Sequence, residues 1–190
     1  MPVPTPDQLG PLGALIGTWE GDEGVDFSFH HAEGQTGDTP YFERVTMNPF
    51  GPVDNGSQVL FGLDYRMAAW RKTELDGDPF HTEVGYWLWD AAASQVMRCF
   101  VVPRGITVIA GGTAAADAKE WVFSAECGSV TYGVLSNLYE DANAKTVRYE
   151  CKITVGDDTW SYDEDTVLEM SNLPELLHHT DRNTLKKVDG

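Results

Sequence analysis

Residues 147–155 read Val-Arg-Tyr-Glu-Cys-Lys-Ile-Thr-Val and alternate apolar and polar side chains without exception. Successive side chains of a β-strand point to opposite faces, so this stretch predicts a strand with one buried face and one solvated face. The same alternation occurs at residues 59–65 and 120–127. Weaker versions predict further strands at residues 17–30, 41–48, 81–90, 95–102, 106–111, 131–138 and 159–170. These patterns together predict about ten strands.

Clusters of Gly, Asp, Asn and Pro separate these stretches, at residues 54–56, 76–79, 103–105, 141–144 and 156–158. Such residues favour tight turns, so neighbouring strands should pair as hairpins. Short strands at even spacing, with almost no helical periodicity, predict an all-β fold. An up-and-down barrel and a sandwich both fit this pattern, and we expect the antiparallel up-and-down barrel. Gly21 and Gly24 should produce bulges where its first strand coils.

A short helix is predicted before the first strand, over residues 7–16. Its apolar side chains are spaced at three and four residues and share one face, and they are Leu9, Leu12, Leu15 and Ile16. This helix should close one end of the barrel. We predict one domain over residues 1–190, with the barrel at residues 17–188.

The chain carries 13 Lys and Arg against 30 Asp and Glu, a formal net charge of −17. Such a surface repels phosphate backbones and anionic lipid headgroups, so we expect neither nucleic-acid nor membrane binding. No stretch approaches the ~18 apolar residues of a membrane span, and no leader follows Met1, which predicts a cytoplasmic location. The chain has an odd number of cysteines, with no Cys-x-x-Cys spacing, and each lies in an apolar alternating run: Cys99, Cys127 and Cys151. They are predicted to be free buried thiols.

A barrel of this size can enclose one small ligand. The six Trp, eight Phe and seven Tyr could form the walls of a ligand cavity or pack a filled core. We expect a small-molecule ligand inside the barrel. Both a monomer and a homodimer are compatible with the pattern.

His178 and His179 are adjacent, so on a strand only one of them can face the interior. A neutral imidazole on the wall would suffice to bind haem iron, although such a pair can also be structural or solvated. Asp181 could orient a ligating imidazole through its second nitrogen, or cap a turn. His81 and Glu83 share a strand face and could form a hydrogen bond or transfer protons. The five histidines show no spacing typical of a zinc site.

Several short motifs, taken in order, resemble those of the nitrobindin family of haem-binding β-barrels. They are Gly-Thr-Trp-Glu-Gly-Asp-Glu-Gly at 17–24, Pro-Tyr-Phe-Glu at 40–43, His-Thr-Glu-Val-Gly-Tyr at 81–86, Pro-Arg-Gly at 103–105 and the histidine-containing segment that ends in Thr-Leu-Lys-Lys at 184–187. The resemblance spans nearly the whole chain and implies a barrel of the lipocalin or fatty-acid-binding-protein type. It implies haem b bound by a histidine near the C-terminus, with an open, apolar space on the other side of the iron. It further implies nitric oxide binding and the isomerisation of peroxynitrite to nitrate, and it assigns no catalytic side chain.

Carried onto this chain, the resemblance makes His179 the iron ligand and His178 the alternative. The other cofactor-binding residues that it implies are Trp19, Gly21, Tyr41 and Leu185.

The predicted barrel, taken without the resemblance, also allows a different function. The cavity could carry a fatty acid or another apolar molecule without haem, oriented by a guanidinium that pairs with its carboxylate. The candidate arginines are Arg44, Arg66 and Arg98. A third interpretation, a plain interaction module, would require a filled barrel.

Overall fold

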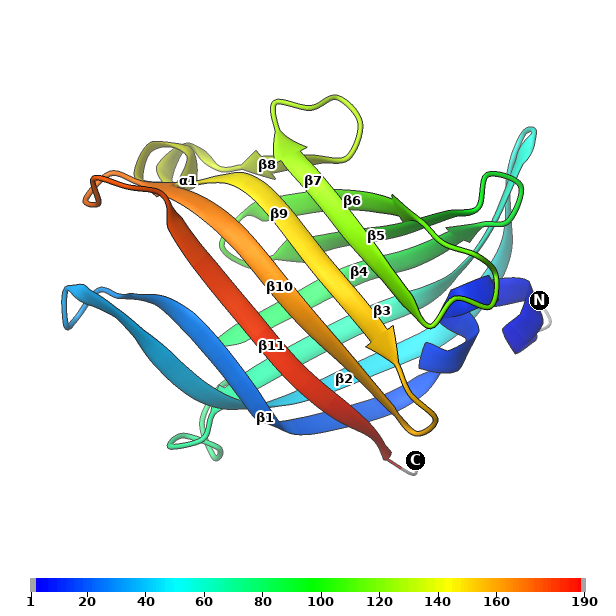
Figure 1. Cartoon of the computed structure of the whole chain (residues 1–190), viewed down its shortest axis with the longest axis horizontal. Coiled ribbons are helices and arrows are strands. Elements are labelled where there is room, and N and C mark those ends of the chain that lie inside the picture. The colour runs from blue at the N-terminus through cyan, green and yellow to red at the C-terminus, as the bar shows by residue number, and fades with distance from the viewer. Residues whose placement is uncertain (1–2, 189–190) are drawn as a thin grey trace.

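The computed structural model describes residues 3–188, which form a closed barrel of eleven strands with a short helix at each end (Figure 1). The elements are the 3-10 helix η1 (Pro6–Leu15), β1 (Gly17–His30), β2 (Gln35–Asn55), β3 (Gln58–Arg71), β4 (His81–Asp90), β5 (Gln95–Val102), β6 (Ile106–Thr113), β7 (Glu120–Cys127), β8 (Gly133–Ser136), α1 (Leu138–Asn143), β9 (Ala144–Val155), β10 (Thr159–Met170) and β11 (Leu177–Val188). The predicted all-β barrel is confirmed. The predicted domain of residues 1–190 extends beyond the described residues at both ends.

Most strands follow one another around the barrel in chain order, and hydrogen bonds between β1 and β11 close it. The exception is β8, which lies between β6 and β7 and runs parallel to β7. The prediction of one strand at 131–138 and a turn at 141–144 is therefore wrong in detail. Asn137 ends the strand early because its Oδ1 accepts hydrogen bonds from the backbone N–H groups of Tyr139 and Glu140, at 2.8 and 3.0 Å. That side chain caps α1.

Helix η1 lies against β3 and β4 and fills one end of the barrel, as predicted. Its side chains Leu9, Leu12 and Leu15 are fully buried. Gly10 has φ of +55°, and a Cβ there would lie 2.5 Å from the Trp89 ring. The close approach of η1 to that ring therefore requires glycine. Neither helix of the described residues is long and apolar enough to cross a membrane.

The half of the barrel next to η1 has a packed core. Trp19 donates a hydrogen bond from Nε1 to the Leu15 carbonyl, at 2.8 Å, and so joins the first strand to the helix. The surrounding core side chains come from seven strands, and they include Val45, Met47, Leu63, Trp87, Trp89, Val96, Ala110, Trp121, Phe123 and Ile153. Most tryptophans therefore pack this core.

The glycines of the first strand produce the predicted bulge. The register between β1 and β2 shifts between Gly21 and Gly24. A Cβ at Gly24 would lie 2.4 Å from the ring of Tyr41, so glycine lets that ring pack directly against the backbone. The bulge thus decides how Tyr41 enters the barrel.

The three cysteines are free thiols, as predicted, but they differ in burial. Cys151 is buried, Cys99 is half-buried and Cys127 is exposed. The prediction of burial is wrong for Cys127 because it is the last residue of β7, where the strand leaves the packed wall.

Replacing Leu12 by Ala should lower the free energy of unfolding by about 2–5 kcal/mol, because the change leaves a cavity under η1. Urea unfolding followed by tryptophan fluorescence measures the loss. The matched control is Val130→Ala at a fully exposed position, which should change it by less than about 0.5 kcal/mol. Equal, small effects of both variants would show that η1 does not close the core.

Candidate functional site

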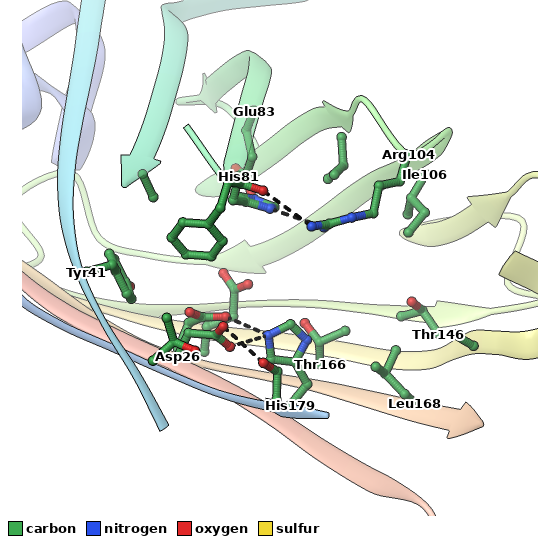
Figure 2. Close-up of a pocket in the computed structure, with 18 of the residues that line it drawn as sticks. Asp26, Tyr41, His81, Glu83, Arg104, Ile106, Thr146, Thr166, Leu168 and His179 are labelled. Carbon is green, nitrogen blue, oxygen red and sulfur yellow. Dashed lines mark hydrogen bonds and ion pairs between the residues drawn. The ribbon is translucent and has the colours of Figure 1, made fainter. Parts of the chain in front are cut away.

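The other half of the barrel holds a cavity of about 660 Å³, lined from the strand ends that lie away from η1 (Figures 1 and 2). This volume lies within the range of small-molecule sites, about 300–1,000 Å³. Much of the wall is apolar, and its larger apolar side chains are Phe29, Met67, Phe80, Phe100, Val102, Ile106, Val108, Trp160, Leu168, Met170 and Leu177. The barrel is therefore hollow in one half and packed in the other.

A buried guanidinium forms part of the cavity floor. Arg98 donates hydrogen bonds to Glu83 at 2.7 Å and to Glu164 at 2.8 Å. It also donates to the hydroxyl of Tyr65 at 3.1 Å and to that of Tyr149. Burial raises the pKa of Glu83, but the charge of Arg98 together with the contacts of His81 and Tyr65 outweighs burial and lowers that pKa to about 2. Glu83 is therefore ionised throughout the neutral range.

A second buried carboxyl group lies beside two tyrosines. Glu43 accepts hydrogen bonds from the Tyr162 hydroxyl at 2.8 Å and from the Asn183 amide at 3.0 Å. The Tyr162 hydroxyl is also 2.6 Å from that of Tyr41. Burial raises the pKa of Glu43 to about 7, although both hydrogen bonds oppose the shift. Glu43 thus changes its charge near neutral pH.

The two adjacent histidines of β11 face opposite sides of the wall, as the alternation predicts. His178 is exposed on the outer face, where its Nδ1 lies 2.9 Å from Asp165. His179 lines the cavity. Asp181, two residues further, shares the inner face with it.

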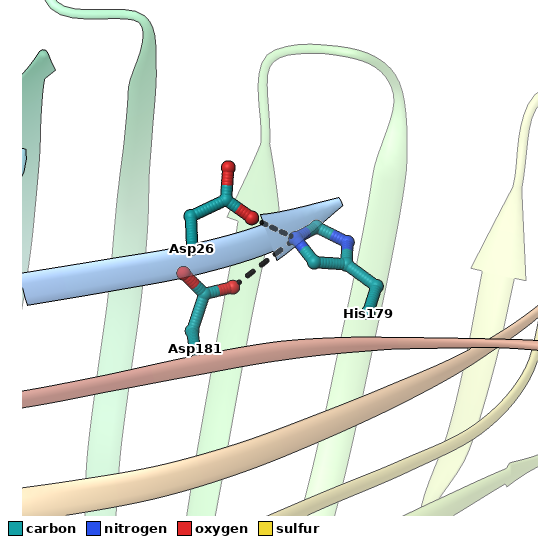
Figure 3. A group of neighbouring side chains, drawn as sticks. All are labelled: Asp26, His179 and Asp181. Atoms are coloured by element: carbon teal, nitrogen blue, oxygen red, sulfur yellow. Dashed lines mark hydrogen bonds and ion pairs between the residues drawn. The ribbon is translucent and has the colours of Figure 1, made fainter. Parts of the chain in front are cut away.

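His179 lies between two carboxylates (Figure 3). Its Nε2 is 2.8 Å from Asp26 and 3.2 Å from Asp181. The two aspartates are direct cross-strand neighbours on β1 and β11, where like charges repel. Burial lowers the pKa of His179, but hydrogen bonds to Asp181 and Asp26 outweigh burial and raise that pKa to about 10. The ring is therefore an imidazolium, which offsets one of the two negative charges and lies between the repelling carboxylates.

The same three side chains could also hold a metal ion, since their ligand atoms all lie within 4.8 Å of one another. A histidine with two carboxylates is a donor set that divalent transition metals accept. The imidazolium already forms ion pairs with both carboxylates, so their ligand atoms have a partner without an ion.

Of the residues that the resemblance implied, His179 and Tyr41 line the cavity. His178 does not face it. Trp19, Gly21 and Leu185 lie outside the cavity lining and belong to the packed half, where Leu185 is fully buried and a Cβ on Gly21 would meet the Asn183 amide. Their connection with a ligand stays a prediction.

The sequence reasoning missed Asp26 and Glu43. The sequence pattern could have indicated that Glu43 is buried, because it stands at an inward position of an alternating strand, between Tyr41 and Val45. The pattern gives no such indication for Asp26, because the bulge between Gly21 and Gly24 breaks the alternation before it.

Comparison with protein-family models matches residues 8–187 to the family described as THAP4-like, heme-binding beta-barrel domain. Among solved structures, the crystal structure of Rv2717c from M. tuberculosis is similar, with a TM-score of 0.66 and 19% sequence identity. The similarity covers 96% of this chain and 98% of that chain, and at this identity it shows the fold alone. Comparison with curated proteins gives no significant match.

The raised pKa of Glu43 predicts a pH-dependent stability. Between its unfolded pKa of 4.5 and its folded pKa of about 7, the folded state holds more protons, so this contribution to stability is lost as the pH rises. Between about pH 5 and pH 8, the wild type should lose more free energy of unfolding than Glu43→Gln, which cannot ionise. Urea unfolding at both pH values measures the difference. The control is Glu126→Gln at an exposed position, and parallel pH profiles of all three proteins would contradict the prediction.

Removing the imidazole should release the repulsion between the two aspartates. At neutral pH, His179→Ala should lower the free energy of unfolding by about 1–3 kcal/mol, and His178→Ala by less than about 0.5 kcal/mol. Asp26→Asn combined with His179→Ala should recover part of the loss, because one of the two opposed charges is gone. Thermal and urea unfolding of the single and double variants measure the coupling. If the losses of the two single variants simply add in the double variant, the charge of His179 does not counter the repulsion between Asp26 and Asp181.

Proposed function

Because the chain belongs to the family of THAP4-like, haem-binding β-barrel domains, we propose that it binds haem in its cavity with His179 as the iron ligand. The observation that carries the proposal is an imidazole on the inner wall of a largely apolar cavity of about 660 Å³. One histidine suffices to hold a haem iron, and the apolar wall suits the faces of a porphyrin.

The residues around His179 fit the role of an iron ligand. A ligating histidine in proteins usually has its second ring nitrogen held by a carboxylate or carbonyl, which orients the ring. Asp26 and Asp181 are placed for that task. Ligation needs a neutral imidazole, so the proton on Nδ1 must leave for the iron to bind there, while Nε2 keeps the proton that the aspartates hold.

The cofactor type proposed is haem b. The sequence contains no Cys-x-x-Cys-His motif, which covalent attachment of a c-type haem would use. Binding would then rest on the iron ligand and on contacts with apolar side chains such as Phe100 and Leu168.

When bound, the haem would supply an iron with an open coordination position for small ligands. Following the resemblance, we propose nitric oxide as such a ligand and the isomerisation of peroxynitrite to nitrate as the reaction. The chain's own part is to hold the cofactor, to orient His179 and to exclude water from the faces of the porphyrin with the apolar side chains of the wall.

None of the three arginines that the sequence suggested for a fatty-acid carrier offers a free charge to the cavity. Arg98 is already paired with Glu83 and Glu164. Arg44 pairs with Glu20 on the outer face, and Arg66 is exposed there. A fatty-acid carboxylate would therefore add a third negative charge beside Arg98.

Titration of the purified apo-protein with haemin, followed by visible absorption, tests the proposal. The wild type should bind with saturation and show a Soret band, and His179→Ala should bind roughly tenfold more weakly or worse. The matched control is His178→Ala, which changes the neighbouring imidazole on the outer face and should bind like the wild type. Saturable binding lost in His178→Ala alone would assign the other histidine, and no binding by the wild type would overturn haem binding.

A further inference from the structure

We infer that Arg104 and His81 form a binding site for a planar oxyanion on the cavity wall opposite His179 (Figure 2). His81 begins β4, and β1, β2 and β3 separate β4 from β11 around the barrel, so the two histidines face each other across the cavity. The resemblance implied an apolar space on this side. The structure instead has an imidazole and a guanidinium there.

The charge of Arg104 distinguishes it from the other arginines of the cavity. Three arginines line the cavity, and two of them are paired with carboxylates. Arg98 pairs with Glu83 and Glu164, and Arg71 pairs with Glu74 at 3.2 Å. Within the described residues, Arg104 pairs with no carboxylate, although the chain has 30 acidic residues. Its positive charge is therefore available to a ligand.

Two contacts, neither of them with a carboxylate, hold the guanidinium of Arg104 in place. Its Nη1 lies 3.5 Å from Nδ1 of His81, and its Nη2 donates to the Phe80 carbonyl at 3.4 Å. These contacts orient the guanidinium without neutralising it. The remaining N–H groups can meet a planar oxyanion in the two-point geometry that arginine favours.

The backbone of Arg104 is fixed as well. Its carbonyl accepts a hydrogen bond from the Asn137 side chain at 2.5 Å, and the next carbonyl, that of Gly105, accepts one from the Asn137 backbone at 3.0 Å. Asn137 also caps α1. The turn between β5 and β6 is thus tied to the helix at the cavity mouth.

The buried ion pair of Glu83 and Arg98 orients the ring of His81. Its Nε2 lies 3.3 Å from Glu83, and Glu83 is held by Arg98. This contact places Nδ1 toward Arg104. Asp26, on the wall that carries His179, lies on the opposite side of the cavity from Arg104 (Figure 2).

The oxyanion has two chemical sources. It can be a carboxylate of the bound cofactor, and this version rests on the proposed function. It can also be a free planar oxyanion, for which nitrate is the probe, and this version does not require haem.

The first arm of the test uses the apo-protein. Nitrate replaces chloride stepwise at constant ionic strength, and the NMR signals of the Arg104 side chain and the His81 ring are followed. A free-oxyanion site predicts saturable shifts in the wild type and at least roughly tenfold weaker binding in Arg104→Gln. Arg71→Gln is the matched control, because Arg71 lines the same cavity but is paired, and it should bind like the wild type. Arg104→Lys keeps the charge without the planar fork and should also weaken binding.

The second arm titrates the same variants with haemin. Roughly tenfold weaker haemin binding by Arg104→Gln than by Arg71→Gln, without nitrate binding to the apo-protein, assigns the site to a cofactor carboxylate. Nitrate binding through Arg104 in a protein that binds no haemin would keep this inference and overturn the proposed function. Equal effects of Arg71→Gln and Arg104→Gln in both arms, or no effect in either, would overturn the site.

Discussion

The buried guanidinium of Arg98 marks the boundary between the packed half of the barrel and its cavity. It lies 5.4 Å from the ring centre of Trp87, which belongs to the packed core. On the other side it lies 4.7 Å from the ring of Phe100, which lines the cavity. A charge at this depth is stable only when it is paired and hydrogen-bonded, and Glu83 and Glu164 meet that condition. These ion pairs form the floor on which the cavity begins.

The other buried carboxyl groups of the cavity are also satisfied by partners in the chain. Asp26 and Asp181 share the imidazolium of His179. Glu43 is stabilised by Tyr162 and Asn183, and by holding its proton up to about neutral pH. Arg104 is the exception among the cavity arginines, which is why a negatively charged group is the natural complement of its wall.

The candidate site depends on the closure of the barrel. His179 and Asp181 come from the last strand, whereas Asp26 comes from the first strand, and only the β1–β11 ladder makes them neighbours. Asp26 lies directly opposite Asp181 in that ladder, so the register decides the proton affinity of His179. A shift of one residue would turn Asp26 to the outer face and leave His179 with one carboxylate. The ligand properties of this imidazole are thus a consequence of how the two chain ends meet.

Local sequence patterns determined most of the strands, the place of helix η1 at one end of the barrel, the bulge at Gly21 and Gly24, and the opposite orientation of His178 and His179. Each of these follows from side-chain periodicity or from the backbone freedom of glycine, which act over a few residues. The tertiary structure alone decided that Asp26 meets His179, that Glu83 and Glu164 meet Arg98, and that Arg104 meets no carboxylate. It also decided that β8 runs parallel to β7. Those outcomes join residues far apart in the chain, and they depend on strand register, barrel closure and the competition of many carboxylates for few cations, which no local pattern contains.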